Sequence, residues 1–221
     1  MKAISLPLLL SFFVLMLTAC THTQKEYYPS GQIKSEVTTK SGKYQGEAVY
    51  YYETGKAMMS CTYKDNMLEG SLLRYYQSGY RKELQTYQKG ILNGAARTWD
   101  RYSHMIQEMN YVNGKPEGLF QEWYPNRVLK VDGHYKNGMY EGIWMYYDSF
   151  GRVTGQGEFT NGNGSQKAYY SNGQIKQFTH YKNSIKDGEE IFYAENGKIT
   201  QSIVYKGGNA INTTAPGSPK K

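Results

Sequence analysis

The stretch Tyr75-Tyr76-Gln77-Ser78-Gly79, followed by Tyr87-Gln88-Lys89-Gly90-Ile91-Leu92-Asn93-Gly94, decides the fold of this 221-residue chain. Its aromatic positions Tyr75 and Tyr87 lie 12 residues apart, with a turn signal between them. The same interval recurs along most of the chain, at Tyr51, Tyr63, Tyr75, Tyr87, Trp99, Tyr111, Trp123, Tyr135, Tyr147 and Phe159, and after one interval of 10 at Tyr169, Tyr181, Tyr193 and Tyr205. A fixed period over so long a stretch predicts a repeat architecture.

A second series, made of glycines, shows that the repeating unit has 24 residues. Its first members are 24 residues apart, and one later interval is 22: Gly46, Gly70, Gly94, Gly118, Gly142, Gly164 and Gly188. The shorter interval places a two-residue deletion between Phe159 and Gly164, near Asn161-Gly162-Asn163. Each unit therefore carries two aromatic positions, five and seventeen residues after its glycine.

Turn residues divide each unit into two strands. Asn113-Gly114, Asn137-Gly138 and Asn161-Gly162 are strong hairpin signals because both residues tolerate positive φ. A 12-residue step then holds a strand of roughly 6–8 residues and a turn of roughly 4–6. We therefore predict an all-β fold, an elongated antiparallel meander of about 16 strands made of stacked β-hairpins, in which aromatic residues of successive units form ladders.

The residue before each glycine of this series carries a side-chain oxygen. These residues are Gln45, Glu69, Asn93, Glu117, Glu141, Asn163 and Asp187. Amides and carboxylates replace one another freely here, which acid–base catalysis or metal binding would not permit. We therefore interpret them as acceptors for hydrogen bonds from backbone N–H groups of the turns.

The N-terminus predicts a lipid anchor. Residues 1–19 have the form of a signal peptide, with Lys2 before a short apolar core. The sequence Leu17-Thr18-Ala19-Cys20 resembles the bacterial lipobox, which implies cleavage before Cys20 and acylation of that residue; an ordinary signal peptide with a chance cysteine is the alternative. The residue after the cysteine is Thr21 and not Asp. In diderm bacteria this pattern resembles that of lipoproteins sent to the outer membrane. We expect a lipid-anchored protein of the cell envelope.

The remaining chain divides into three parts. We expect a lipid-proximal spacer at 20–25, a repeat array of about eight units at 26–208, and a disordered tail at 209–221. With Cys20 acylated, Cys61 has no partner for an intramolecular disulfide, and we interpret it as a small packed residue.

The units resemble MORN repeats, specifically the bacterial variant of the YwqK-like family that is often labelled an antitoxin. The resemblance rests on Tyr75–Gly79 with Tyr87–Gly94, on Tyr135–Gly142 and on Tyr169–Lys176, and it covers roughly 26–208. It implies stacked β-hairpins in an elongated sheet. It also implies a scaffold or a module that contacts proteins or lipids.

The composition and motifs argue against an enzyme and against nucleic-acid binding. The formal net charge is +7, but the lysines and arginines are scattered, whereas a nucleic-acid site would cluster them. His22, His104, His134 and His180 show no metal-ligand spacing. We predict no catalytic residues, no metal site and no cofactor.

Two adjacent units depart from the pattern, at about 99–130. The turn at 100–104 lacks the usual glycine, so we expect its conformation to differ, and the turn at 124–127 lacks the glycine too. Binding hot spots are rich in Trp, Tyr and Arg, and the candidates here for contact with a protein partner are Trp99, Arg101, Tyr102, Trp123, Tyr124 and Arg127. The leading hypothesis is a membrane-anchored protein-binding or scaffold module. The alternatives are a glycan- or lipid-headgroup-binding envelope protein and an antitoxin-type or immunity-type partner of a toxin.

Overall fold

The computed structural model describes residues 20–214, so the predicted signal peptide at 1–19 lies outside the described residues, as do residues 215–221. All regular elements of the described part are strands. They are β1 Thr21–Tyr27, β2 Ile33–Lys40, β3 Lys43–Tyr51, β4 Ala57–Lys64, β5 Met67–Leu68, β6 Gly70–Tyr75, β7 Arg81–Gln88, β8 Ile91–Trp99, β9 Met105–Val112, β10 Lys115–Trp123, β11 Leu129–Lys136, β12 Met139–Tyr147, β13 Val153–Thr160, β14 Asn163–Tyr169, β15 Ile175–Lys182, β16 Ile185–Tyr193, β17 Ile199–Lys206 and β18 Asn209–Thr214. Between residues 20 and 214 no helix is long and apolar enough to cross a membrane.

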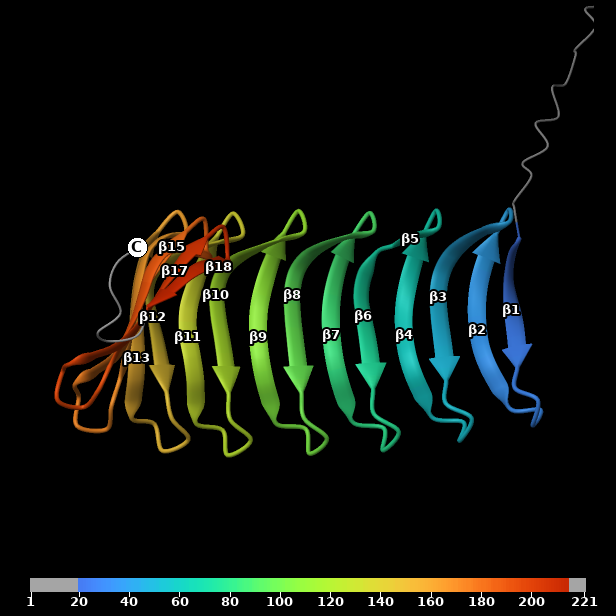
Figure 1. Cartoon of the computed structure of the whole chain (residues 1–221). Coiled ribbons are helices and arrows are strands. Elements are labelled where there is room, and N and C mark those ends of the chain that lie inside the picture. The colour runs from blue at the N-terminus through green and yellow to red at the C-terminus, as the bar shows by residue number, and fades with distance from the viewer. Residues whose placement is uncertain (1–19, 215–221) are drawn as a thin grey trace, which may run out of the picture.

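The strands form one open antiparallel meander of 18 strands, in which each strand pairs with its neighbours in sequence (Figure 1). β5 and β6 are two pieces of one strand interrupted at Glu69, and both pair with β4. The predicted all-β meander of hairpins is confirmed.

The sheet is longer at both ends than the sequence predicted. β1 begins at Thr21, inside the segment expected to be a spacer, and pairs with β2 along its whole length. β18 reaches Thr214, inside the expected tail, and pairs with β17. Backbone pairing needs no apolar period, so these polar strands gave no signal in the sequence.

Each glycine of the 24-residue series lies opposite the aromatic residue that follows it by 17 positions. The pairs are Gly46–Tyr63, Gly70–Tyr87, Gly94–Tyr111, Gly118–Tyr135, Gly142–Phe159, Gly164–Tyr181 and Gly188–Tyr205. All of these glycines except Gly164 have a positive φ, between 67° and 118°. That backbone conformation favours glycine and produces a bulge in the strand, which explains why the glycine recurs.

The aromatic series divides between the two faces of the sheet. The core face holds the buried residues Ala48, Cys61 and Leu72 in one cluster and Trp144 and Phe159 in another. Strand alternation places on this face the aromatic residues Tyr63, Tyr87, Tyr111, Tyr135, Phe159, Tyr181 and Tyr205. It places on the other face, here the second face, Tyr51, Tyr75, Trp99, Trp123, Tyr147, Tyr169 and Tyr193.

The oxygen-bearing residues before the glycines join neighbouring units along the row of turns at one end of the strands. Each accepts a hydrogen bond from the backbone N–H group 20 residues later, at 2.6–3.3 Å. The series runs from Gln45, which accepts from Asp65, to Asp187, which accepts from Gly207. The prediction that these side chains bind turn backbone is confirmed.

Tyrosines join the units at the opposite ends of the strands. We call this second row of turns the tyrosine edge. In five units the tyrosine that opens the turn donates its hydroxyl hydrogen to the backbone carbonyl 23 residues later, at 2.7–2.9 Å. The donors are Tyr28, Tyr52, Tyr76, Tyr124 and Tyr170. At the equivalent positions Asp100 and Asp148 accept hydrogen bonds from N–H groups of their own turns instead.

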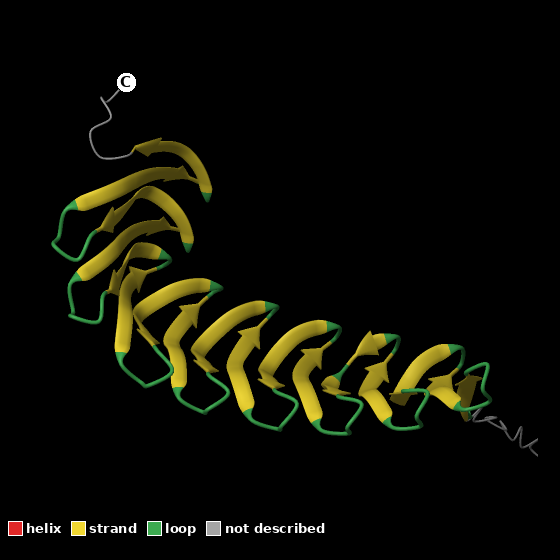
Figure 2. Ribbon diagram, turned by 60° about the horizontal axis from the view of Figure 1, so that its bottom comes forward, coloured by secondary structure: helices red, strands yellow, loops and turns green. Residues whose placement is uncertain are grey.

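The two-residue deletion changes the course of the sheet. The β13–β14 hairpin pairs without a register shift from Thr160–Asn163 to Gly155–Ala168, because it lacks the two residues that Met139 and Tyr140 supply in the hairpin before. The rings of Tyr140 on β12 and Tyr181 on β15 are 6.2 Å apart, although two strands lie between them. A flat sheet would separate these strands by about 14 Å, so the sheet bends here toward the core face. The resulting arch is visible in Figure 2.

Candidate functional site

The tyrosine edge presents a row of five-residue turns, and their backbone is uniform. In the turn at 100–104 the N–H of Asp100 donates to the carbonyl of His104, as the N–H of Tyr52 donates to the carbonyl of Lys56. Ser103 has a φ of 69°, close to the 81° of the usual glycine Gly55. The same holds for Arg127, with a φ of 67°, in the turn at 124–128. The prediction that the turn at 100–104 differs in conformation was therefore wrong, and the turn at 124–128 is regular as well.

Ser103 and Arg127 nevertheless carry backbone strain. A residue with a Cβ atom in the left-handed region costs on the order of 1 kcal/mol relative to glycine. The turn hydrogen bonds, such as Arg127 N–H to the carbonyl of Tyr124 at 2.8 Å, hold the strained conformation in place. What differs in these units is thus the side chains that the turns present.

The structure separates the six predicted partner-binding residues into two groups. Trp99 and Trp123 end β8 and β10 on the second face and are half-buried. Arg101, Tyr102 and Arg127 lie in turns of the tyrosine edge and are exposed, Tyr102 to 73%.

Tyr124, the sixth predicted residue, has a structural role. Its hydroxyl donates to the carbonyl of Tyr147, and the ammonium of Lys130 lies 5.8 Å from the centre of its ring. It joins two neighbouring units as its equivalents do elsewhere in the array.

Three further exposed residues on the same edge were not predicted from the sequence. Phe150 is 81% exposed and Tyr80 is 55% exposed, and Arg152 ends the turn that holds Phe150 and is exposed as well. For Phe150 the available signal was an aromatic residue at a turn position that is Ser, Thr or Asn in most other units. The central turns therefore carry exposed aromatic and basic side chains: Tyr80, Arg101, Tyr102, Arg127, Phe150 and Arg152. We call these six residues the central turn row.

The charge of the central turn row is positive. The carboxylate of Asp100 is occupied by the N–H groups of Tyr102 and His104; burial opposes its charge, but these hydrogen bonds outweigh burial and lower its pKa. Asp148 pairs with Arg152 at 2.7 Å. Within residues 20–214 neither Arg101 nor Arg127 forms an ion pair, so both guanidinium groups face solvent.

Two hollows lie near this part of the sheet. One, of about 350 Å³, lies beside the turns at 100–104 and 124–128. Trp123 and Tyr124 line it together with Asp100, whereas the other predicted residues do not. Lys130 and Glu122 also line this hollow, and they form an ion pair with 2.6 Å between Lys130 Nζ and Glu122 Oε1. The hydrogen bond to Glu122 raises the pKa of Lys130.

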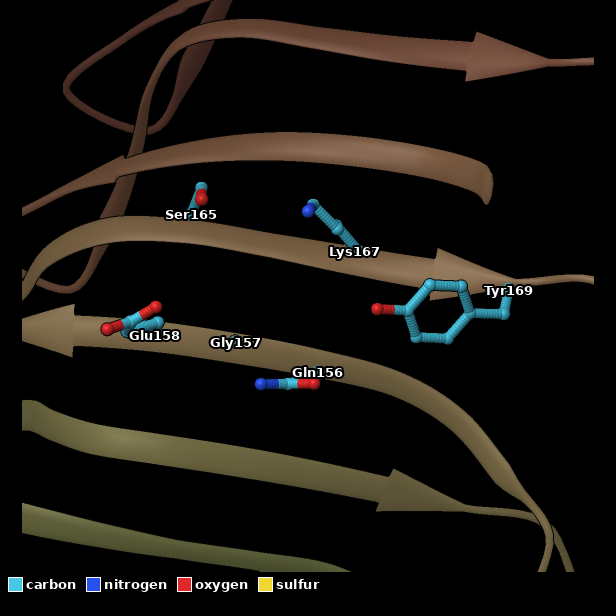
Figure 3. A pocket seen from close by; sticks show the side chains of 6 residues that line it. All are labelled: Gln156, Gly157, Glu158, Ser165, Lys167 and Tyr169. Atoms are coloured by element: carbon cyan, nitrogen blue, oxygen red, sulfur yellow. The ribbon is translucent and has the colours of Figure 1, made fainter. Parts of the chain in front are cut away.

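The other hollow is smaller, about 100 Å³, and lies on the second face over β13 and β14 (Figure 3). Gln156 and Glu158 reach it from β13, and Ser165, Lys167 and Tyr169 reach it from β14. None of these residues was singled out as a ligand-binding candidate from the sequence, because they converge only in the register of the shortened hairpin.

The cysteines and histidines do not form a further centre. Cys61 is buried beside Ala48, as predicted for a small packed residue, and burial raises the pKa of its thiol. Cys20 is exposed at the start of the described region. Among the described residues there is no cluster of three or more potential metal ligands.

Comparison with known proteins supports the repeat pattern. Five segments match the MORN repeat variant, at residues 23–41, 44–65, 116–137, 163–183 and 186–206. These five segments are similar to MORN-variant repeats. Such repeats suggest a repeat-based module for binding or scaffolding. Most of the central turn row, including Tyr102 and Phe150, lies in the segments 66–115 and 138–162, which are outside the matched residues.

Other comparisons add little to this result. Among solved structures, a porin-like protein from Bacteroides uniformis is 9% identical, over 87% of this chain and 89% of that chain, with a TM-score of 0.19. A likeness this weak carries no argument. No curated protein matches the chain.

Proposed function

We propose that the protein is a lipid-anchored cell-envelope protein whose repeat sheet binds another protein along the central turn row. The single observation that carries this proposal is the contrast between central and terminal turns. Exposed aromatic rings and arginines occupy the central turns, whereas the exposed positions of the turns at 52–56, 170–174 and 194–198 carry small polar residues, glutamates, Gln174 and the lysines Lys56 and Lys198. Tyr and Arg dominate the binding energy of protein interfaces, and exposed aromatic residues in a row are rare unless they are covered by a partner.

The charge of the row indicates the chemistry of the partner. Arg101 and Arg127 are unpaired within the described region, and guanidinium groups bind carboxylates through two parallel hydrogen bonds. Acidic side chains between apolar contacts would complement this row. A rigid sheet also keeps the spacing of the turns fixed, so little conformational entropy is lost on binding.

The membrane anchor is the second part of the proposal. It is supported by the lipobox-like sequence before Cys20 and by the exposure of that residue at the end of the sheet. Mass spectrometry of the protein from the detergent phase should find acyl chains on Cys20 of the parent protein and none on the Cys20→Ser variant. A mature parent protein without acyl chains on Cys20 would refute the anchor.

Crosslinking in intact cells tests the binding surface. A variant with Arg101→Ala, Tyr102→Ala and Phe150→Ala should lose most of the crosslinked partners while its far-UV spectrum and unfolding midpoint stay unchanged. The matched control replaces Glu53, Asn172 and Asn196 by alanine in terminal turns and should keep the partners. If the first variant captures the same partners in the same amounts, the central turn row is not the binding surface.

A further inference from the structure

The small hollow on the second face differs from its surroundings because its polar side chains are not paired. Elsewhere on this face cross-strand neighbours bind one another: Lys25 pairs with Glu36 and Arg97 with Glu108, each at 2.6 Å, and Gln121 donates to Asp132 at 3.1 Å. Gln156 and Lys167 are cross-strand neighbours in the same way. Within residues 20–214 their side chains form no hydrogen bond with each other or with another residue.

The same holds for the other three side chains of the hollow. Glu158 lies opposite Ser165, and neither side chain has a hydrogen-bond partner in the described part of the chain. Figure 3 shows the Tyr169 ring at one end, with its hydroxyl directed toward the hollow, and Glu158 and Ser165 at the other end. An amide, a carboxylate, a hydroxyl and an ammonium therefore converge beside an aromatic ring, with their hydrogen-bonding capacity free.

We infer that this hollow, formed by Gln156, Glu158, Ser165, Lys167 and Tyr169, is a subsite for one sugar ring of an uncharged oligosaccharide. Sugar hydroxyls both donate and accept hydrogen bonds, so they satisfy Glu158 and Lys167 at the same time. The apolar face of a sugar ring packs on an aromatic ring such as Tyr169. The inference does not depend on the protein-binding proposal, because it concerns a different face and a different ligand.

The charge balance argues against two other ligands. An anionic headgroup would gain from Lys167 but would lie beside the carboxylate of Glu158. An apolar peptide would bury both charges without a partner, which costs several kcal/mol. A neutral ligand with many hydroxyl groups avoids both costs.

The size of the hollow indicates a chain rather than a single sugar. A volume of about 100 Å³ holds only part of a sugar ring, so the ligand must extend over the surrounding surface. Tyr193 occupies the position of Tyr169 in the next unit, two strands away, which is about 9.6 Å along the backbone of the sheet. That interval is similar to the length of one disaccharide in an extended chain. An oligosaccharide crossing the strands can thus meet a second ring after Tyr169.

Titration with defined sugars tests the inference. The probes are the hexamer of β-1,4-linked N-acetylglucosamine and the hexamer of α-1,4-linked glucose, added to the full isotope-labelled chain in detergent. At least one should give saturable amide shifts in β13 and β14, with a dissociation constant on the order of 1 mM or tighter. No saturable shift with either probe would overturn the inference, and so would tighter binding of inositol phosphate at the same amides.

Variants decide whether the named side chains form the subsite. Lys167→Met and Tyr169→Ala should each weaken binding about tenfold, a loss of about 1.4 kcal/mol. Gln121→Leu is the matched control: Gln121 lies on the same face but is already bonded to Asp132, so affinity should stay within about twofold. Lys167 is exposed, and its replacement should not affect folding, which far-UV spectra can check. Unchanged affinity in Lys167→Met would refute the assignment whatever happens to partner capture by the turn variants.

Discussion

The regular hairpins from β2 to β7 and the bend formed by β12 and the short hairpin β13–β14 share one sequence pattern but give different structures. In the regular part the core is thin and includes small residues such as Ala48 and Cys61. At the bend the rings of Trp144 on β12 and Phe159 on β13 are almost completely buried, at 3% and 2% exposure. The presence or absence of two residues, the equivalents of Met139 and Tyr140, thus decides whether a repeat continues the sheet or bends it. Without them the hairpin has no bulge, and the units on either side come closer together.

Glycines make the bend possible. A Cβ atom at Gly133 would collide with the ring of Trp144, and one at Gly157 would collide with the ring of Phe159. These glycines have ordinary extended backbones, so they are required for space and not for a positive φ. The glycines of the 24-residue series are required for a different reason, because six of them adopt a positive φ.

The largest expected effect comes from restoring the missing residues. Inserting Met-Tyr between Gly162 and Asn163 should recreate the bulge, separate Tyr140 from Tyr181 and straighten the sheet, because the hairpin then matches the regular ones. Small-angle X-ray scattering should show a larger maximum dimension. The same dipeptide inserted after Asn196, in an exposed turn, serves as the control and should leave the profile unchanged. An unaltered distance distribution after the first insertion would show that the deletion does not cause the bend.

Deletion of core side chains should separate the two regions energetically. Trp144→Ala should lower the free energy of unfolding by about 4 kcal/mol, since it removes the largest buried ring of the bend. Leu72→Ala should cost about 2 kcal/mol, because the thin regular core can collapse around the smaller side chain. Urea unfolding followed by far-UV circular dichroism measures both. Equal losses would contradict the distinction between a deep core and a thin one.

The response to pH should differ between the bend and the C-terminal units. Buried Glu190 accepts hydrogen bonds from Gln177 and Thr179 and pairs with Lys186; burial opposes its charge, but the donors, Lys186 first, outweigh burial and lower its pKa. Its contribution is fully present above the pKa of the unfolded chain, about 4.3, and is lost as the pH falls toward the folded pKa.

The bend should respond at the other end of the pH scale. Burial raises the pKa of Tyr135 and Tyr181 to about 12. Their contribution is present below the unfolded pKa of about 10 and is lost as the pH rises from there to about 12. Hydrogen exchange should therefore show acid loosening first around Glu190 and alkali loosening first around Tyr135. Glu190→Gln should remove most of the acid effect; an unchanged acid profile in that variant would assign the effect to other carboxylates.

Much of this architecture could be predicted from local spacing, whereas the bend and the hollow could not. The role of Glu117 and its equivalents as acceptors for turn N–H groups could be predicted, because amides and carboxylates replace one another at this position of the repeat. The division of the aromatic series between two faces depends on turns and bulges that reverse the strand alternation between Tyr51 and Tyr63. The convergence of Gln156 and Lys167 depends on the register of the short hairpin, which the sequence locates only as a deletion.

The smallest expected effect concerns the turns that present the predicted binding residues. Arg127→Gly should raise the free energy of unfolding by up to about 1 kcal/mol, because glycine adopts a φ of 67° without strain. The same variant should weaken partner capture, since it removes an unpaired guanidinium from the central turn row. Gly55→Arg, at the equivalent position of a terminal turn, is the converse and should destabilise without improving capture. Stabilisation by Arg127→Gly together with full capture would leave the strain at Arg127 without a functional reason and would restrict the binding surface to Arg101, Tyr102 and Phe150.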